Sequence, residues 1–504
     1  MHEKGAVSKD PGGRLNIALV YPNTYFVGMS NLGVHAMYRA FNDHPGIVCE
    51  RFFSDFTRSV ESARAISDFH IIAFSVSYEL DWINAARILT EAKIPILATE
   101  RLGAAVVIAG GAAVTMNPEP AADMLDLCFL GDGEPAPVML YDAFVKSSGY
   151  EEFLDRLEGS PGIYIPGRPF NKTFSCSTIN PIASPAHTAI ITDSTAFSDM
   201  FLVEIARGCP FSCMFCAARK IYSPFRAVKL DNLIPVFEKA KATGLKLGMV
   251  SASLNNHPQT ADMFEVIRNM GINIAPPSLR LGMITPGLIS LIELSGTKGV
   301  TLAPETGSEQ LRKSISKDIS NEVILNDIEA LVSAGIRDIK LYFMIGLPGE
   351  NTHDVDSIVD LVKRCRQSFI KVSKGNRRIG NIQVSVNTFV PKPHTDFERM
   401  EMVDIKDAKM RLKRIEDGLK LQSNVRLSYE GPKWAYLQAV IARGDRHVLE
   451  LIIRLADVPE SNWQDALKSW ERNPDYYALR KRNENEALPW GFLRNKCLNS
   501  NLTP

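Results

Sequence analysis

Three closely spaced cysteines are the residues of this chain best suited to chemistry. Cys209, Cys213 and Cys216 form a C-x3-C-x2-C pattern, and an apolar run over residues 200–206 comes just before them. That run predicts a buried strand, so the cysteines are expected on the loop at its carboxyl end, where α/β folds place their reactive groups. Three thiolates on one loop can ligate three irons of a cubane cluster and leave its fourth iron without a nearby protein ligand.

A structural zinc ion and a disulfide are the alternatives for these cysteines. A structural zinc site needs a fourth Cys or His at usable spacing. The next cysteine, Cys365, is far along the chain, and no histidine follows the motif closely. Eight cysteines with only three of them clustered fit a reducing cytoplasm, which disfavours a disulfide. The pattern therefore favours an iron–sulfur cluster.

The cysteine motif resembles the signature of the radical SAM superfamily. Phe215, directly before the third cysteine, matches the aromatic residue that this family carries there. The resemblance implies a [4Fe-4S] cluster whose open iron binds S-adenosylmethionine (SAM), with Phe215 beside the cofactor. It also implies reductive cleavage of SAM to methionine and a 5′-deoxyadenosyl radical, which abstracts hydrogen from an unactivated carbon. Flavodoxin or ferredoxin would be the electron donor.

Two strand ends resemble the family's contacts with the amino acid part of SAM. Ser251 and Ser253 follow the second predicted barrel strand, where the family has an acidic Gly-Gly-Glu-like edge that is missing here. Farther on, Glu305-Thr-Gly-Ser-Glu, followed by Arg312, matches another family motif. Glu305 would accept from the ribose or the amine, and Arg312 would clamp the carboxylate. A helix N-cap is the structural alternative for this stretch.

Two later strand ends are expected near adenine. Residues 342–350 resemble the family's G-x-I-x-G-x-x-E region and contain Gly346, and Val390 lies in a stretch that also matches the family. Between them, residues 363–378 carry seven Lys and Arg and no acid. A solvated helix end is the simpler interpretation of that basic stretch, and an anionic substrate, a partner or RNA is the alternative.

Residues 1–150 alternate short apolar runs with helical periodicity, which predicts a doubly wound, Rossmann-like parallel sheet. Gly110, Gly111 and Gly131 follow predicted strands, where glycine permits close approach of a ligand or simply makes a turn. The stretch resembles the cobalamin-binding-like domain that precedes many radical SAM cores, which implies a cobalamin at these glycines. His70 is not the expected cobalt ligand, because it opens a strand and does not follow the first one.

The rest of the chain divides by pattern. Residues 151–197 are a Pro-rich connector, 198–395 alternate strands and helices, and 396–504 read as a helical C-terminal domain with four of the five tryptophans. A partial TIM-type (β/α)6 barrel is what the family resemblance implies for residues 198–395. A chain of 504 residues is too long for one core, so several domains are expected.

Composition narrows the function. Lys+Arg and Asp+Glu are 57 each, so nucleic acid is not indicated as a partner by net charge, although it stays an alternative. The N-terminus is polar and apolar runs are short, which predicts a cytoplasmic enzyme without a membrane span. The leading hypothesis is a radical SAM enzyme with cobalamin-dependent methyl transfer. The alternatives are cobalamin-free rearrangement, cyclisation or modification of RNA or a metabolite, and a non-catalytic iron–sulfur or zinc module.

Overall fold

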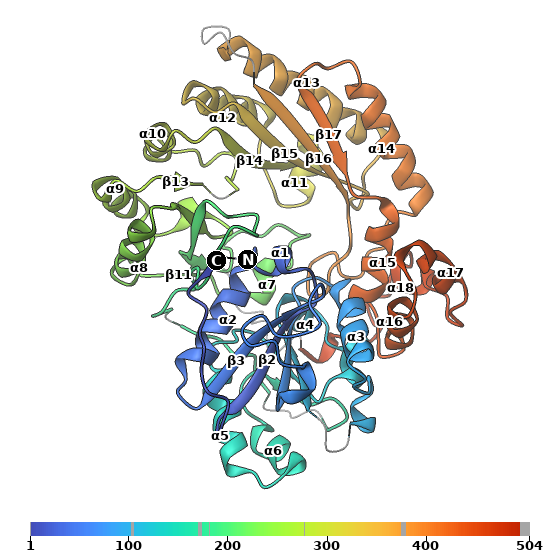
Figure 1. The fold of residues 1–504 in the computed structure, drawn as a ribbon. Coiled ribbons are helices and arrows are strands. Elements are labelled where there is room, and N and C mark those ends of the chain that lie inside the picture. The colour runs from blue at the N-terminus through green and yellow to red at the C-terminus, as the bar shows by residue number, and fades with distance from the viewer. Residues whose placement is uncertain are drawn as a thin grey trace.

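The computed structural model describes residues 2–101, 105–169, 174–180, 182–276, 278–373 and 380–493. Parallel strands form two regions, one above the other in Figure 1, with helices around both. The carboxyl ends of the two sets of strands meet in the middle, because Asp132 after β6 pairs with Arg207 after β9, and Glu79 after β4 pairs with Lys392 after β16.

The N-terminal sheet has six strands in the order β3-β2-β4-β5-β6-β7. Their bounds are β2 Leu15–Tyr21, β3 Ile47–Phe53, β4 Ile71–Ser75, β5 Val106–Gly110, β6 Leu127–Phe129 and β7 Ile163–Tyr164. The first five are parallel and β7 is antiparallel to β6. On β2, Ile17 faces one apolar core and Ala18 faces the other, which is why this strand reads as an unbroken apolar run. The predicted doubly wound sheet is confirmed.

Helices cover both faces of this sheet. One face carries α2 (Leu32–Asp43), α5 (Ala136–Lys146) and α6 (Tyr150–Leu157), whose apolar residues share a core with the odd-numbered residues of β2. The other face carries α3 (Asp81–Glu91) and α4 (Ala112–Met116). Strands β1 (Glu3–Lys4) and β8 (Ile191–Thr192) pair at the edge of this region, and α1 (Tyr25–Gly28) follows β2.

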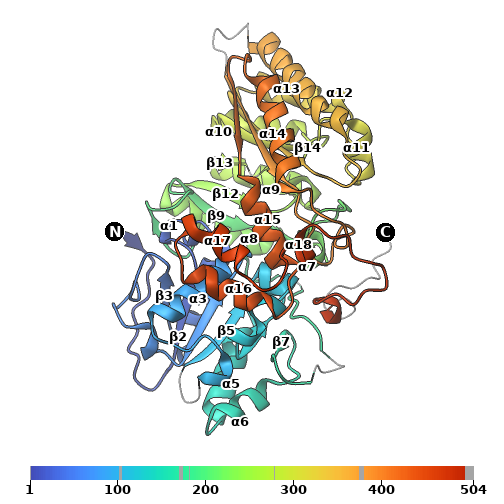
Figure 2. The ribbon, with the colours of Figure 1, turned by 90° about the vertical axis from the view of Figure 1, so that its right-hand side faces the viewer.

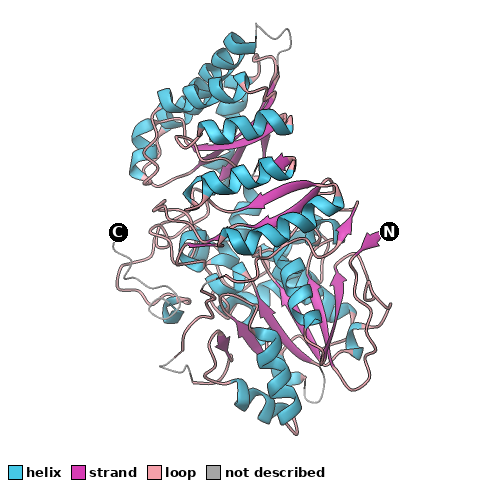
Figure 3. Ribbon diagram, turned by 90° about the vertical axis from the view of Figure 1, so that its left-hand side faces the viewer, coloured by secondary structure: helices cyan, strands magenta, loops and turns pink. Residues whose placement is uncertain are grey.

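The second set of strands forms two parallel sheets, β13-β12-β9 and β14-β15-β16-β17. Their bounds are β9 Met200–Glu204, β12 Lys246–Val250, β13 Ile274–Ala275, β14 Gly299–Glu305, β15 Asp338–Ile345, β16 Asn381–Thr388 and β17 Val425–Tyr429. A parallel bridge between Leu279 and Leu302 joins the two sheets. The connecting helices pack outside them, as Figure 3 shows; they are α8 Leu230–Thr243, α9 Thr260–Met270, α10 Pro286–Ser295, α11 Glu309–Ser314, α12 Asn321–Ser333, α13 Thr352–Ser373 and α14 Ile405–Leu419.

The chain after residue 395, predicted as a helical domain, also contains strand β17. This strand pairs in parallel with β16, from Ile382–Val425 to Val386–Tyr429. Its five residues are all partly or fully exposed, so they lack the apolar run that predicts a buried strand.

In the described part of the chain, the C-terminal helices share their apolar core with the N-terminal region. They are α15 Pro432–Ala442, α16 Val448–Ala456, α17 Trp463–Lys468 and α18 Asp475–Ala478, and they lie beside the N-terminal sheet in Figure 2. Their apolar residues belong to the same core as α3. The Asn117 amide donates to the carbonyls of Ala442 (3.1 Å) and Gly444 (2.8 Å). Within the described ranges, no helix has the length and apolar character needed to cross a membrane.

Candidate functional site

The cysteine loop is held at its base by a short hairpin. Strand β9 ends at Glu204, and β10 (Ala206–Arg207) pairs antiparallel with β11 (Arg226–Ala227). The loop begins at Gly208, whose φ is +82° and where a Cβ would lie 2.5 Å from the Tyr222 carbonyl oxygen, so only glycine fits. Helix α7 (Ala218–Ile221) follows the third cysteine. The loop thus follows the carboxyl end of β9, as the sequence predicts.

Backbone N–H groups point at two of the three thiols. The N–H of Phe211 lies near the Cys209 thiol, and the N–H groups of Ala218 and Arg219 lie near the Cys216 thiol. Burial raises the pKa of both thiols, and these N–H groups act in the opposite direction. Both residues are partly exposed, so their sulfurs are accessible to a cofactor.

A cation lies beside the remaining thiol, that of Cys213. Cys213 is 9% exposed, and Arg280 Nη1 lies 3.9 Å from its sulfur. The Arg280 guanidinium stacks on the Phe211 ring, 3.4 Å from the ring centroid. Its segment is anchored to β14, because the N–H of Leu279 donates to the carbonyl of Thr301. Arg280 is a residue that the sequence interpretation missed.

This donor set fits an iron–sulfur cluster. Three thiols on one loop, with N–H groups and a guanidinium near the sulfurs, match the ligands and the hydrogen bonds that such clusters use. A zinc ion would need its ligands to converge on one point. No three His, Cys, Asp or Glu side chains do so in the part of the chain that the structure describes.

Glu305 lies at the carboxyl end of β14 and pairs with a lysine that the sequence interpretation missed. Lys317 Nζ lies 2.6 Å from Glu305 Oε1, and the two side chains are 7% and 13% exposed. Glu305 has a φ of +70°, a strained value for a residue with a side chain. Lys317 acts electrostatically on Cys209, which places this ion pair near the cysteine loop.

Arg312 does not lie where the sequence interpretation puts it. Its side chain is fully buried, and its guanidinium donates to the carbonyls of Ile319 (2.7 Å) and Thr306 (2.6 Å) and to the Asn321 side chain. These contacts fasten the turn between α11 and α12. The helix N-cap alternative also holds here, because Ser308 accepts from the N–H of Leu311.

Ser251 and Ser253 follow β12 as expected, and they bond locally. The Ser251 hydroxyl oxygen accepts from the N–H of Ser253, and the Ser253 hydroxyl donates to Asn256 Oδ1 at 2.6 Å. Ser253 is buried and Ser251 is partly exposed, so Ser251 is the better placed of the two to meet a ligand.

The loop after β15 is built around Gly346 and Glu350. Gly346 has a φ of +80°, and a Cβ there would lie 2.4 Å from Val403 Cγ1. One oxygen of Glu350 accepts from the N–H groups of Gly346 and Leu347 and lies 3.2 Å from Arg411. Burial raises the pKa of Glu350 to about 7, against the pull of Arg411 and these N–H groups.

An apolar cluster joins this loop to the cysteine loop. It consists of Leu311, Ile315, Leu347, Phe389 and Phe397, with Met214, Phe215, Met344 and Met400 packed against it. Phe215 therefore lies against the ends of β15 and β16. Val390 belongs to the other core, with α3 and the C-terminal helices, whereas its neighbour Phe389 belongs to this apolar cluster.

The N-terminal glycines meet their own chain. A Cβ at Gly111 would lie 2.5 Å from the Val76 carbonyl oxygen, and one at Gly131 would lie 2.2 Å from the Ser177 carbonyl oxygen. Gly110 has Phe129 beside it on the neighbouring strand. The space that a Cβ would take at Gly111 and Gly131 is thus filled by backbone, so both glycines serve the packing of the chain itself.

The basic stretch of residues 363–378 is described up to residue 373, where it lies on helix α13. Residues 374–378 lie outside the described residues. On α13, Arg366 donates to the carbonyl of Ser423 and to the Asn424 side chain, and Lys371 lies 3.4 Å from Glu329. These contacts agree with the solvated-helix interpretation.

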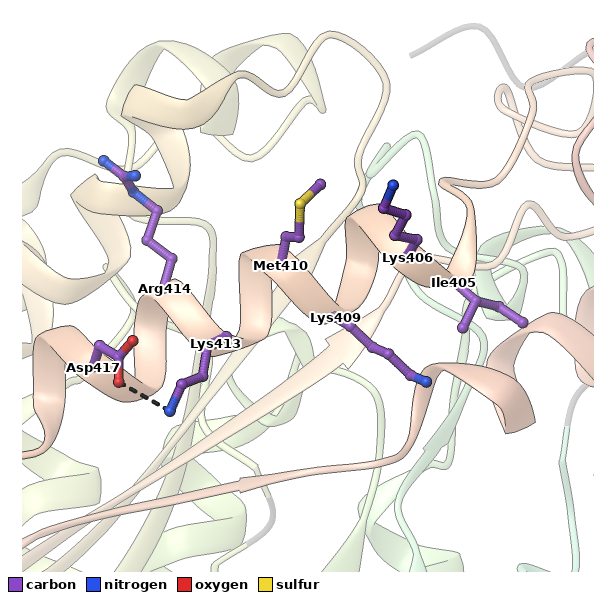
Figure 4. A pocket seen from close by; sticks show the side chains of 7 residues that line it. All are labelled: Ile405, Lys406, Lys409, Met410, Lys413, Arg414 and Asp417. Atoms are coloured by element: carbon purple, nitrogen blue, oxygen red, sulfur yellow. Dashed lines mark ion pairs between the residues drawn. The ribbon is translucent and has the colours of Figure 1, made fainter.

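A shallow hollow of about 780 Å³ lies on the neighbouring helix α14 (Figure 4). Its lining residues are Ile405, Lys406, Lys409, Met410, Lys413, Arg414 and Asp417. All of them come from one outer helix face, where Lys413 pairs with Asp417 at 3.0 Å, so the hollow is not part of the candidate site.

Two family models match the chain. The model described as "Radical SAM proteins, N-terminal" matches residues 33–166, and the one described as "Radical SAM superfamily" matches residues 203–362. The protein MJ0966 of Methanocaldococcus jannaschii is 31% identical over 438 residues, which cover 86% of this chain and 89% of that protein. The ribosomal protein uS12 methylthiotransferase RimO of Trichodesmium erythraeum is 20% identical over 225 residues, or 41% of this chain and 49% of RimO.

Solved structures share the fold. The radical SAM methyltransferase TsrM from Kitasatospora setae, with tryptophan and a SAM analogue bound, matches with a TM-score of 0.55 and 14% identity, over 79% of this chain and 76% of TsrM. The cobalamin-dependent enzyme OxsB, with aqua-cobalamin bound, matches with a TM-score of 0.51 and 15% identity, over 69% of this chain and 52% of OxsB. At these identities the similarity shows the fold alone.

Proposed function

Because the chain belongs to the radical SAM superfamily, we propose that this enzyme cleaves SAM reductively at a [4Fe-4S] cluster held by Cys209, Cys213 and Cys216. The observation that carries the proposal is the set of three thiols on one loop, with N–H groups near those of Cys209 and Cys216 and Arg280 beside that of Cys213. When bound, the cluster supplies one electron for cleavage of the C–S bond of SAM to methionine and a 5′-deoxyadenosyl radical.

Glu305 and Lys317 are proposed to hold the amino acid part of SAM. That part carries an ammonium and a carboxylate, and the ion pair offers one partner for each at 2.6 Å from one another. Binding would exchange the internal pair for two charge-assisted bonds to the ligand. The positive φ of Glu305 fits this role, because backbone strain persists where the surroundings hold a residue in place for function.

The apolar cluster beside Phe215 is proposed to cover adenine and keep water out. Phe215, Leu347 and Phe389 come from three different strand ends and pack together. Gly346 lets the loop after β15 approach closely, and Glu350 fixes that loop through two backbone N–H groups. A dry wall protects a carbon radical from side reactions.

Formation of 5′-deoxyadenosine tests the proposal. Anaerobically reconstituted protein should release it from SAM when dithionite is added, and should release none without the reductant. A protein that carries the cluster and binds SAM yet forms no 5′-deoxyadenosine would refute the proposed function, and would favour a non-catalytic iron–sulfur module.

Cobalamin-dependent methyl transfer is a second candidate, favoured by the fold shared with TsrM and OxsB. Because backbone fills the space beside Gly111 and Gly131, a corrinoid is proposed to bind elsewhere between the two sets of strand ends. Cobalamin-free rearrangement, cyclisation or modification of RNA or a metabolite is the alternative outcome of the same radical. Mass spectrometry of metabolites and RNA nucleosides from a deletion strain would separate these outcomes.

The setting of the enzyme also stays a proposal. The reaction needs an external electron, and we propose flavodoxin or ferredoxin as its source and the cytoplasm as its compartment. We also propose domains at residues 1–150, 151–197, 198–395 and 396–504. Strand β17 of the last domain pairs with β16 of the third, and the helices of the last domain share a core with the first.

A further inference from the structure

Arg207 ties the cysteine loop to the N-terminal sheet. It lies two residues before Cys209, and its side chain is 12% exposed. Its guanidinium lies 2.8 Å from Asp132 Oδ1, 2.6 Å from Glu134 Oε1 and 2.8 Å from Glu204 Oε1. Asp132 and Glu134 follow β6, so Arg207 joins the carboxyl end of that strand to the carboxyl end of β9.

Asp132 bonds both strands of the hairpin below the cysteines. One of its oxygens meets Arg207 on β10, and the other meets Arg226, which is the residue opposite Arg207 on β11. The Asp132 side chain is 5% exposed. Burial would raise its pKa, but the two arginines outweigh burial and hold the pKa below its ordinary value. The carboxylate is therefore ionised at neutral pH.

The connector closes over the same strand end. Its Ile179 N–H donates to Asp132 at 2.7 Å, and its Ile179 carbonyl accepts from Arg226 at 2.7 Å. Ser177 donates through its hydroxyl to the Asp132 carbonyl at 2.7 Å, and its carbonyl oxygen fills the space beside Gly131. Helix α4, which starts after Gly111, contacts helix α7 behind the third cysteine.

We propose that four side chains at this glycine-rich edge, Asp132, Glu134, Arg207 and Arg226, form a latch that positions the cysteine loop. Asp132 is the central positioning residue of the latch, and the edge is not the binding site of a corrinoid. Gly111 and Gly131 serve the latch by letting backbone pack against backbone at the strand ends. Removing the Asp132 charge would leave the buried Arg226 without its carboxylate partner, and Arg207 with Glu134 and Glu204 alone. The hairpin base, and with it the spacing of the thiols, should then loosen.

The test compares two neutralised carboxylates in the full-length, anaerobically reconstituted protein. Asp132→Asn keeps the shape of the side chain and removes its charge. Glu119→Gln is the matched control, because Glu119 pairs with Arg446 of the C-terminal helices at 2.9 Å and lies outside the latch. Iron content and the electron paramagnetic resonance (EPR) spectrum of the reduced cluster, with and without SAM, are measured together with far-UV circular dichroism.

Asp132→Asn is expected to fold, to hold less iron per chain, and to lose most of the spectral change that SAM causes. Glu119→Gln is expected to match the wild type in both. Glu134→Gln should fall between them, because Glu134 meets Arg207 alone and is 26% exposed, and Asp132→Glu should restore part of the signal. Wild-type spectra in Asp132→Asn would overturn the latch. Equal losses in Asp132→Asn and Glu119→Gln would overturn it too, because the effect would then be general loosening of the domains.

Hydroxocobalamin tests the second half of the proposal. If the wild type retains about one corrinoid per chain and Asp132→Asn loses it, the edge is a corrinoid site and the proposal fails. Retention that Asp132→Asn leaves unchanged, or no retention by either protein, supports it. The latch rests on the proposed cluster, so wild-type protein without a cluster would refute the proposed function, whereas unchanged spectra in Asp132→Asn would refute only the latch.

Discussion

The carboxyl edges of the two sets of parallel strands meet in the middle of the molecule and differ in what fills them. At the N-terminal edge, Gly111 and Gly131 are packed against backbone, and Asp132 is closed in by two arginines. At the carboxyl edge of the second set of strands, Cys209 and Cys216 stay partly exposed, and the pair Glu305–Lys317 lies near them. Ligands of parallel sheets bind outside the carboxyl ends of the strands. The direction of the strands therefore shows at which edge a ligand could bind. Whether that edge is open to a ligand depends on how far the chain's own loops fill it.

The largest effect is expected when a cysteine of the loop after β9 is removed. Cys213→Ala should abolish the cluster, because a cubane with two remaining protein thiolates loses its anchor on the loop, and iron should fall from about four per chain to near zero. Cys365→Ala is the control, since that thiol is fully buried in the apolar core on α13. Loss of the cluster from folded Cys365→Ala protein would contradict the three-cysteine assignment.

One buried carboxylate of the N-terminal region, Asp81, makes stability depend on pH. Asp81 is 2% exposed, accepts from the Asn23 amide at 2.9 Å, and has no ion pair within the described ranges. Burial raises its pKa to about 7. The folded state therefore binds the proton more tightly than the unfolded state, and the stability that protonation provides is lost as pH rises from about 4 to about 7.

Asp81→Asn should remove that dependence. The variant should match the wild type at about pH 4 and below, and above pH 7 it should be more stable by on the order of 2–4 kcal/mol. Thermal unfolding at several pH values measures this. A variant that is less stable than the wild type at pH 8 would show that the ionised Asp81 has a partner that offsets its burial.

A smaller effect is expected on SAM affinity, at the carboxyl ends of the second set of strands. Lys317→Met and Glu305→Gln should each weaken SAM binding by about 1.5–3 kcal/mol, or roughly ten- to a hundredfold, because each removes one charge-assisted bond. Arg312→Lys should lower stability and leave SAM affinity unchanged in the folded fraction, because the contacts of Arg312 are internal. Isothermal calorimetry on cluster-loaded protein distinguishes them. Weakened binding in Arg312→Lys alone would return the carboxylate clamp to Arg312.

The smallest expected effect concerns Arg280. A donor near a cluster sulfur raises the reduction potential, so Arg280→Gln should lower it by on the order of 30–60 mV, which is less than about tenfold in the one-electron equilibrium. EPR-monitored titration without SAM measures the potential. Arg414→Gln is the control, because Arg414 lies on the outer face of α14 and pairs with Asp356 of α13. An unchanged potential together with weaker SAM binding would make Arg280 a SAM contact only.

The sequence by itself determined the local features. The cysteine spacing and the apolar runs that become β2 and β9 are short-range patterns, because a buried parallel strand is apolar on both faces wherever it lies. The same logic missed β17, whose residues are exposed and lack such a run. Glycine spacing identified turns at strand ends, and it carried no information about what would fill the space beside them.

Only the tertiary structure decided which charges meet. Lys317 and Arg280 lie far from the cysteines in the chain, and no local pattern marks them as neighbours of the loop. Arg312 looked like a ligand clamp because arginine suits a carboxylate, yet the turn after α11 brings carbonyl oxygens to it first. Asp132 follows a glycine in a motif typical of ligand sites, and folding brings two arginines from the cysteine hairpin against it. Ion pairs between distant segments depend on how sheets dock, and docking is a property of the whole packed chain.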